Sequence, residues 1–492
     1  MKDRRRIDLK ALAREAMVKY GFEPEFPRSV ITEVNAMSPD LSSPRQYDIR
    51  DMRSLLWSSL DNYDSEDLDQ LEYCEVGKSG EVLVRVAIAD VDHFVKKGSH
   101  TDRHAAHNGT SVYLGVETFP MLPDRLSKGI SSLLPGEDRR AMVVEYTVLP
   151  GGSVRNGGIY RALVNNKAKL VYEEVGDWLE GAAPVPVSVS SIPGLEDQIR
   201  LQAEVTRRLR SRRMKEGALD LETLEAEPVM KGETVHSLAI QEQNAARQII
   251  EEFMVAANGT MVHVLGAAKI PMIQRVVRVP KHWDGIVETA AAYRYTLPKE
   301  PDSKALAKFL DRQRAADPER FPDLSLTIVK LMGPGEYVPF VPGDTPIGHF
   351  ALAVVDYTHS TAPNRRYVDI VNQRILKAVL DEEAVPYPGH ELGRLAEWLS
   401  DREKASQKAE RFMRKVAAAL LLERRIGETF DAIVTGAAEK GTYVRLLDPP
   451  AEGRVVEGER GLRVGNKVSV RLLSTDPPRG FVDFACVKKP PR

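Results

Sequence analysis

The chain has 492 residues, of which 42% are hydrophobic and 28% are charged, and its 69 Lys and Arg against 71 Asp and Glu give a net charge of −2. This composition excludes a disordered or fibrous protein, and the length favours two to four domains. Because the charge is balanced, a function in nucleic-acid binding would need local basic patches.

Cysteine usage and hydropathy indicate where the protein works. Only Cys74 and Cys486 occur, far apart in the chain, so we expect no disulfide framework and a reducing, cytoplasmic compartment. The N-terminus runs directly into charged residues without the apolar stretch of a signal peptide. No apolar run reaches the roughly 18 residues of a transmembrane helix, so we expect no membrane partner.

Two short helices are expected at the start of the chain. Apolar residues on one face predict a helix over residues 4–20, and a second helix is expected over Ser29–Met37. The pair could be a helix-turn-helix module or an extension that docks on the rest of the protein, and we favour the extension. A loop rich in Ser, Pro and Asp follows at residues 35–44 and marks the first domain boundary.

The middle of the chain mixes strands and helices. Strands are expected over residues 82–91, 142–149 and 159–163. Helices are expected over residues 197–215, 244–263, 363–380 and 392–423. This order predicts an α+β fold with one large mixed domain.

The sequence pattern changes after Gly427, where short segments of alternating hydrophobicity, typical of strands, are separated by Gly and Asp-Pro-Pro. The expected strands cover residues 430–435, 442–447, 467–473 and 481–486. Four or five short strands in about 65 residues predict a small closed barrel, most simply an OB-fold. We therefore divide the chain into a helical segment (1–42), a mixed domain (43–424) and a barrel (425–492).

The most distinctive segment is acidic. Residues 61–72 hold six carboxylates and no Lys or Arg. Such a run is either a solvated turn or a site where a divalent cation neutralises the repulsion, and oxygen ligands suit Mg²⁺ or Mn²⁺. An EF-hand is excluded, because Tyr63 and Glu66 occupy the third and sixth positions, where that motif needs an acid and a glycine.

A second segment, residues 356–369, places two arginines after a proline. Pro363 suits the first position of a helix, which would put Arg365 and Arg366 in its first turn. The helix dipole disfavours cations there unless an anion shares the site, so the pattern predicts a phosphate site. The alternative is that Arg365 only pairs with Asp369 at i, i+4.

Three further features have ordinary structural explanations when taken alone. Glu410 lies on a predicted helix and could simply pair with Arg414. The basic run at residues 207–213 could be a solvated helix face, and Tyr113 an aromatic side chain in a strand.

Together, these motifs resemble the RNB catalytic domain of the ribonuclease II and ribonuclease R exoribonucleases. The resemblance rests on Asp61-x5-Asp67-x-Asp69, on residues 357–369 and on the segment from Glu251 to Asn258. Residues 120–123 and 167–172 strengthen it, and the barrel resembles the S1 RNA-binding domain that follows RNB in this family. The likeness covers about residues 43–488.

The resemblance implies hydrolysis of single-stranded RNA from its 3′ end to nucleoside 5′-monophosphates, with Mg²⁺ (or Mn²⁺) as cofactor in a two-metal mechanism. Asp61, Asp67, Asp69 and Gln70 would be the metal ligands, and Asp67, Asp69 and Arg365 the catalytic residues. RNA would contact Tyr113 by stacking, Arg365 at the scissile phosphate, Glu410 at a preceding nucleotide, and also Arg366 and Tyr443. The family also implies a processive enzyme that works as a monomer.

Two departures from the family pattern bear on function. Gln70 stands where the family has a fourth Asp, and an amide brings no negative charge, although Asp64 could compensate. About 42 residues precede the RNB-like region, in place of the family's two cold-shock domains. We therefore expect an RNA entrance that the N-terminal segment partly builds or that is more open. A catalytically impaired RNA-binding protein of RNB shape is the alternative function.

Overall fold

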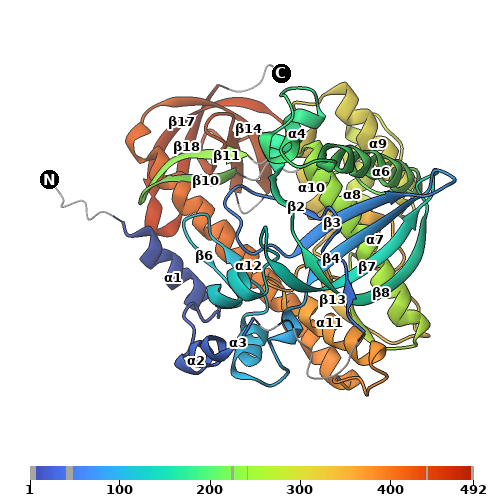
Figure 1. Cartoon of the computed structure of the whole chain (residues 1–492). Coiled ribbons are helices and arrows are strands. Elements are labelled where there is room, and N and C mark those ends of the chain that lie inside the picture. Colours follow the sequence, from blue (N-terminus) through green and yellow to red (C-terminus); the bar gives the residue numbers. More distant parts are fainter. Residues whose placement is uncertain are drawn as a thin grey trace.

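A computed structural model of the chain describes residues 7–39, 41, 48–222, 226–240, 242–438 and 441–488. Figure 1 shows a mixed α/β body with a barrel at one corner, near the C-terminus. None of the helices in the described residues is long and apolar enough to span a membrane.

A seven-stranded sheet forms the centre of the large domain, in the order β1-β8-β7-β4-β3-β2-β9. Its strands are β1 (Arg50–Asp51), β2 (Ser58–Asp61), β3 (Gln70–Val76), β4 (Val82–Ala89), β7 (Asp138–Val148), β8 (Val154–Asn165) and β9 (Ala168–Val171). Neighbours are antiparallel except for the parallel pairs β1–β8 and β2–β9. The acidic segment thus connects two adjacent strands, β2 and β3.

The predicted long helices pack on this sheet and form the main core. α6 (Leu195–Glu216) and α7 (Ala245–Ala267) match their predicted positions, and Asn244 caps α7 by accepting a hydrogen bond from the Arg247 amide. The Tyr146 hydroxyl on β7 donates to the Phe253 carbonyl on α7 at 3.2 Å. Two shorter helices, α4 (Tyr172–Leu179) and α5 (Val187–Ser190), precede α6.

The N-terminal helices dock on the large domain. They are α1 (Leu9–Lys19) and α2 (Arg28–Ala36). The predicted domain boundary at residue 42 lies outside the described residues. Asn108, at the end of α3 (His100–Asn108), accepts from the Glu23 amide at 3.0 Å. Arg402 on α12 (Gly389–Leu422) donates to the Gly21 carbonyl at 2.8 Å. These contacts favour the docked extension over a free helix-turn-helix module.

A second helical group links the sheet to the barrel. It consists of α8 (Trp283–Ala292), α9 (Ser303–Ala316) and α10 (Phe321–Met332), which share a separate apolar core around Phe309 and Phe321. The strands β12 (Met272–Val276) and β13 (Glu336–Phe340) flank the group and pair antiparallel.

The C-terminal region is a closed five-stranded barrel in the order β14-β15-β16-β18-β17, which confirms the predicted OB-fold. Its strands are β14 (Thr429–Ala438), β15 (Gly441–Leu446), β16 (Glu452–Glu457), β17 (Lys467–Asp476) and β18 (Phe481–Lys488). Arg445 of the barrel forms a buried ion pair with Asp323 of α10 at 2.8 Å. The barrel is therefore bound to the helical group rather than tethered loosely.

Short elements complete the chain. They are the hairpins β5 (Val112–Tyr113) with β6 (Thr118–Phe119) and β10 (Ala226–Lys231) with β11 (Thr234–Ile240), a π-helical turn η2 (Arg125–Ile130), and the 3₁₀ turns η1 (Val91–His93), η3 (Phe350–Leu352), η4 (Glu423–Arg425) and η5 (Pro477–Arg479).

One predicted helix begins later than expected. α11 spans Tyr367–Leu380, with Arg366 at its N-cap, so the prediction that Pro363 opens this helix is wrong. Pro363 and Arg365 instead belong to the loop before the helix. A cation in a loop avoids the unfavourable dipole that a first-turn position would impose.

Candidate active site

Protein contacts hold the acidic loop between β2 and β3 in place. Lys169 on β9 donates to the carbonyls of Tyr63 and Ser65, at 2.7 and 2.5 Å. The Ser132 hydroxyl donates to the Glu66 carbonyl at 2.6 Å. The loop is therefore an ordered part of the fold, which argues against a simple solvated turn.

Asp69 is the most deeply buried acid of this loop, with 2% of its surface exposed. One carboxylate oxygen, Oδ1, accepts from the Asn364 amide at 2.9 Å. The other, Oδ2, lies 3.6 Å from the Arg365 Nε and has no hydrogen-bond partner among the described residues. Burial raises the pKa of Asp69 to about 8, against the opposing charge of Arg365. A carboxylate buried in this way is stable in its ionised form only if a further cation lies nearby.

Asp61 and Asp67 precede this buried acid in the chain and line the same cavity. Asp61 ends β2, and its Oδ1 accepts from the Ser65 hydroxyl at 2.6 Å and from the Asn62 amide at 2.8 Å. Burial raises the pKa of Asp67, and the nearby charge of Asp61 raises it further. The carboxylates of Asp61 and Asp67 thus repel each other, and a cation bound by them would relieve this repulsion.

Gln70, Asp64 and Glu72, which belong to the same acidic segment, differ in their burial and surroundings. Gln70 begins β3, is 8% exposed and reaches the same cavity as the aspartates. Asp64, considered as its compensation, is exposed and is not among the described residues that line this cavity. Glu72 lies in the core with neither carboxyl oxygen hydrogen-bonded to a described residue, and burial raises its pKa well above the usual range. Burial thus favours the neutral acid at Glu72.

The loop before α11 brings Arg365 to the acids. The Ser111 amide donates to the Arg365 carbonyl at 2.9 Å, and the Ser131 hydroxyl donates to Asn364 Oδ1 at 2.6 Å. On the other side, Asn258 of α7 accepts from the Ser360 amide at 2.8 Å. The Arg365 side chain stays 47% exposed, so its guanidinium is available to an anion in the cavity.

Arg366 has a different environment from Arg365. Its guanidinium donates twice to Asp369, at 2.8 Å each, and Asp369 also accepts from the Ala362 amide. The ion pair that the sequence suggested for Arg365 is therefore made by Arg366, at i, i+3. Arg366 does not appear among the described residues lining the cavity, so its predicted RNA contact stays a prediction.

These segments surround one cavity of about 450 Å³. Its walls come from the acidic loop, β5, β10, α4, α7, the loop before α11, and α12. The lining residues are Asp61, Asn62, Ser65, Asp67, Asp69, Gln70, Tyr113, Leu114, Gly115, Tyr172, Glu227, Pro228, Arg247, Ile250, Met254, Thr361, Arg365, Glu410 and Arg414.

The cavity also contains two of the predicted RNA contacts. Tyr113 ends the short strand β5 and is 43% exposed, so its ring is accessible for stacking. Glu410 of α12 accepts from the Ser406 hydroxyl at 2.7 Å. Tyr443 lies on the barrel strand β15, is 41% exposed and is not among the described lining residues.

The basic run on α6 is mostly neutralised. Arg208 pairs with Glu204, Arg210 with Asp220, Arg212 with Glu216, and Arg213 with Glu251 and Glu252. The basic run is thus better explained as a solvated or ion-paired helix face than as an RNA-binding surface.

Sequence reasoning missed several residues of the cavity. Tyr172 belongs to the family motif at residues 167–172 but is not among the predicted site residues. Arg247, Glu227 and Pro228 are not predicted from the sequence at all. Spacing within one segment could not have placed them beside the acids, because they come from α4, α7 and β10 and meet the acids only through the fold. A charged residue at the start of a helix after an Asn cap, as Arg247 is, would have been the only hint.

The donor set fits a divalent cation that shares its coordination with substrate. Within the described part of the chain, no group of three or more His, Cys, Asp or Glu side chains is placed so that it could hold a metal ion by itself. Mg²⁺ is commonly held by one or two carboxylates together with substrate phosphates and water, so a complete cage is not needed. The unpartnered Oδ2 of Asp69 and the crowded carboxylate of Asp67 are donors of this kind.

Comparison with known proteins agrees with this geometry. The RNB domain profile matches residues 49–382, and the profile of the RNase II-type exonuclease C-terminal S1 domain matches residues 428–487. The chain belongs to the RNB family. Ribonuclease R of Thermotoga maritima is 30% identical over 94% of this chain and 68% of its own length. Ribonuclease R of Aquifex aeolicus is 29% identical over 96% of this chain and 69% of its own length.

A solved RNB-family structure has the same fold. Mycoplasma genitalium RNase R in complex with ribose methylated single-stranded RNA matches with a TM-score of 0.87 at 23% identity, covering 98% of this chain and 78% of the other. The RNB profile ends before α12, yet α12 supplies Glu410 to the cavity. The wall of this cavity is therefore completed by a helix beyond the matched domain.

Proposed function

We propose that the protein is an exoribonuclease that hydrolyses single-stranded RNA from its 3′ end and releases nucleoside 5′-monophosphates. The observation that carries this function is the meeting of Asp69, Arg365 and Tyr113 at one cavity. Membership of the RNB family and the names of the related ribonucleases R support it. Processive action, a monomeric state and a cytoplasmic location belong to the same proposal.

Each side chain has a role that its position allows. Arg365 places a positive charge beside the acids, where the scissile phosphate gathers negative charge in the transition state. Tyr113 presents a ring face to the terminal base, and such stacking contributes about 1–3 kcal/mol per base without reading sequence. Glu410 would accept hydrogen bonds from a preceding nucleotide. The substrate is thus held by its backbone and base faces, which suits RNA of any sequence.

We propose Mg²⁺, or Mn²⁺ in its place, as the cofactor. Asp61, Asp67 and Asp69 would hold it, with the amide oxygen of Gln70 as a neutral fourth donor. A pair of such cations supplies Lewis acidity to the phosphate and lowers the pKa of water. The protein's own part is to orient the carboxylates: the Asn364 amide fixes one oxygen of Asp69 and leaves the other unpartnered among the described residues.

A labelled RNA tests the function directly. Single-stranded RNA with a 5′ label, incubated with the protein and Mg²⁺, should give a ladder that shortens with time to one small oligomer. The same RNA with a 3′ label should release labelled mononucleotide at once. A 5′→3′ enzyme would give the reverse pattern. Intact RNA that only shifts on a native gel would support the RNA-binding protein without activity instead.

The neutral amide at Gln70 gives a second prediction. Gln70→Asp adds a negative charge beside Asp69 and should tighten Mn²⁺ binding at least about tenfold, because Coulomb attraction to a cation is strong at a buried site. Electron paramagnetic resonance of bound Mn²⁺ measures this without RNA. Gln70→Asn keeps the amide and serves as the control. Equal Mn²⁺ affinity of the Asp variant and the wild type would remove Gln70 from the cation site.

A further inference from the structure

A second, smaller cavity adjoins the catalytic one. It has a volume of about 230 Å³ and is lined by Tyr172, Glu242, Gln243, Arg247 and Glu251. Tyr172 and Arg247 also line the catalytic cavity. These two side chains therefore form a partition with one cavity on each side.

Contacts with each other and with neighbouring residues hold Arg247 and Tyr172 in place. The Arg247 guanidinium carbon lies 4.4 Å from the centre of the Tyr172 ring. Arg247 Nη2 donates to Glu173 at 2.6 Å and to Asn62, the neighbour of Asp61, at 3.2 Å. An arginine–aromatic contact of this kind contributes only about 0.5–2 kcal/mol. A phosphate that replaced Glu173 and Asn62 as the partner of Arg247 would let the arginine side chain rotate, and this would join the two cavities.

The charges on the two sides of the partition differ. Arg247 presents its cation to both cavities, whereas the outer cavity also has the carboxylates of Glu242, which is exposed, and Glu251, which pairs with Arg213. An intact RNA strand, with a charge on every phosphate, is repelled by two acids at an opening. A nucleoside 5′-monophosphate could instead place its phosphate on Arg247, the cation that lines this cavity, and its base beside Tyr172.

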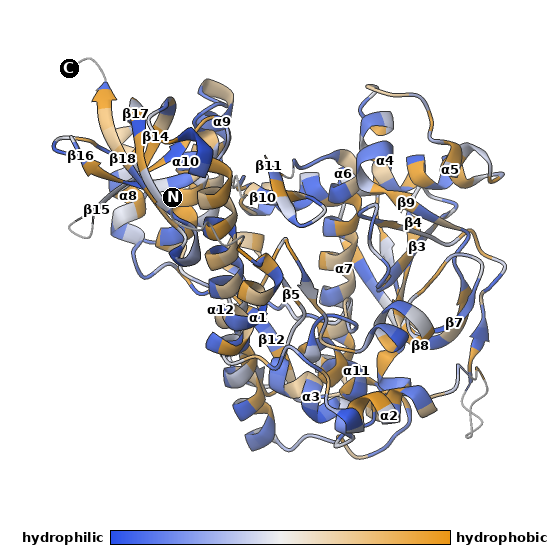
Figure 2. Ribbon diagram, turned by 90° about the vertical axis from the view of Figure 1, so that its left-hand side faces the viewer, coloured by the Kyte–Doolittle hydropathy of each residue, from blue (hydrophilic) through white to orange (hydrophobic). Residues whose placement is uncertain are grey.

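The location of the outer cavity separates it from the expected path of RNA. Figure 2 shows α4 and α12 well apart, with α7 drawn between them in that view. Glu410 and Arg414, which would hold preceding nucleotides, come from α12, whereas the outer cavity lies between the start of α7 and α4. A nucleotide cut from a strand that stays bound cannot leave past that strand, so it needs a separate route.

We propose that the outer cavity is a product site: the released nucleoside 5′-monophosphate passes the Arg247–Tyr172 partition and occupies this cavity before it leaves the protein. Its volume is about half that of the catalytic cavity, which limits the occupant to a single nucleotide and excludes an oligomer. The proposal rests on the exoribonuclease activity proposed above.

Blocking the outer cavity tests the proposal. Glu242→Trp fills it from an exposed position that does not line the catalytic cavity. After mixing with Mg²⁺ and 5′-labelled RNA, the first cleavage should proceed at the wild-type rate. Later cleavages should slow at least about fivefold, because each waits for product release. Glu174→Trp, the same change at an exposed position of α4 outside both cavities, should leave all cleavages unchanged.

Binding of adenosine 5′-monophosphate gives an independent measurement that needs no RNA cleavage. Calorimetry should show weaker binding of this nucleotide to Glu242→Trp and to a second blocked variant, Gln243→Trp, than to the wild type or to Glu174→Trp. Equal slowing of first and later cleavages, no slowing, or unchanged nucleotide binding would each overturn the product site. A wild-type protein that does not cleave RNA would refute the proposed function, while the nucleotide measurement would still decide on the cavity.

Discussion

Asp69→Asn is expected to lower the rate of RNA cleavage at least about a thousandfold while leaving RNA affinity nearly unchanged. The asparagine keeps the size of the side chain and can still accept from the Asn364 amide. It loses the negative charge that the unpartnered Oδ2 offers to a cation. On the proposed function, RNA would be held mainly by Tyr113, Arg365 and the barrel, so binding should survive. Single-turnover cleavage and filter binding of the same RNA measure the two quantities.

Asp64→Asn is the matched control, because Asp64 belongs to the same loop but is exposed and outside the described cavity wall. This variant should cleave RNA at the wild-type rate. Turnover retained by Asp69→Asn within about tenfold of wild type would refute its assignment as a ligand, since loss of an essential group costs far more.

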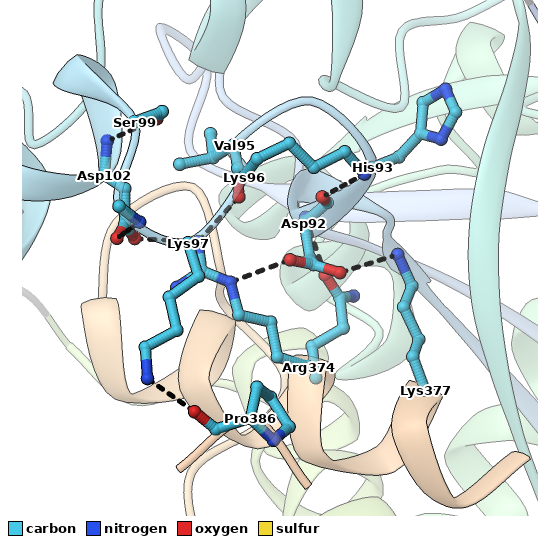
Figure 3. Close-up of polar contacts among 12 residues, drawn as sticks. Asp92, His93, Val95, Lys96, Lys97, Ser99, Asp102, Arg374, Lys377 and Pro386 are labelled. Atoms are coloured by element: carbon cyan, nitrogen blue, oxygen red, sulfur yellow. Dashed lines mark hydrogen bonds and ion pairs between the residues drawn. The ribbon is translucent and has the colours of Figure 1, made fainter. Parts of the chain in front are cut away.

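The second large effect concerns stability and centres on Arg374, on the helix that follows the Arg365 loop. Arg374 is 4% exposed and donates to Asp92 at 2.8 Å, to the Val95 carbonyl at 2.6 Å and to the Tyr387 hydroxyl at 2.7 Å. It also pairs with Asp102 at 2.7 Å. Figure 3 shows this network joining α11 to the segment after β4, with Lys377 beside it on Asp92.

Arg374→Met is expected to lower the free energy of unfolding by about 3–5 kcal/mol, because it leaves the carboxylates of Asp92 and Asp102 short of a cation inside the protein. Urea unfolding followed by fluorescence measures the change. Arg394→Met, at an exposed position of α12, makes the same substitution outside the network and should change stability by less than about 0.5 kcal/mol. Similar midpoints for the two variants would contradict the role given to the network.

Local sequence patterns predicted much of the fold. The positions of α6, α7 and α12 follow from apolar periodicity, and the barrel follows from short strands separated by Gly and Pro. The acidic loop was predicted as a cation site, and the structure places Asp61, Asp67, Asp69 and Gln70 at one cavity. These features could be read locally because the chemistry lies within one short segment.

Other features depend on pairs that are far apart in the chain. The helix dipole argument placed both arginines in a first turn, but the loop is fixed by Ser111, Asn258 and Asp69, and only Arg366 meets Asp369. The α6 arginines looked like a basic stripe because their partners Asp220 and Glu252 are distant or on another helix. Spacing rules predict contacts between residues on one helix or strand, whereas these ion pairs and hydrogen bonds join residues on different elements.

The buried Arg445–Asp323 ion pair fixes the barrel on α10, and Arg320 adds a hydrogen bond to the Gly465 carbonyl at 3.0 Å. These contacts hold the barrel in one position relative to α10. On the proposed function, a shrinking RNA loses its grip on the barrel at one particular length. The length of the RNA fragment left at the end would then be set by the position of the barrel relative to the acids, and not by the chemistry of the cleavage site.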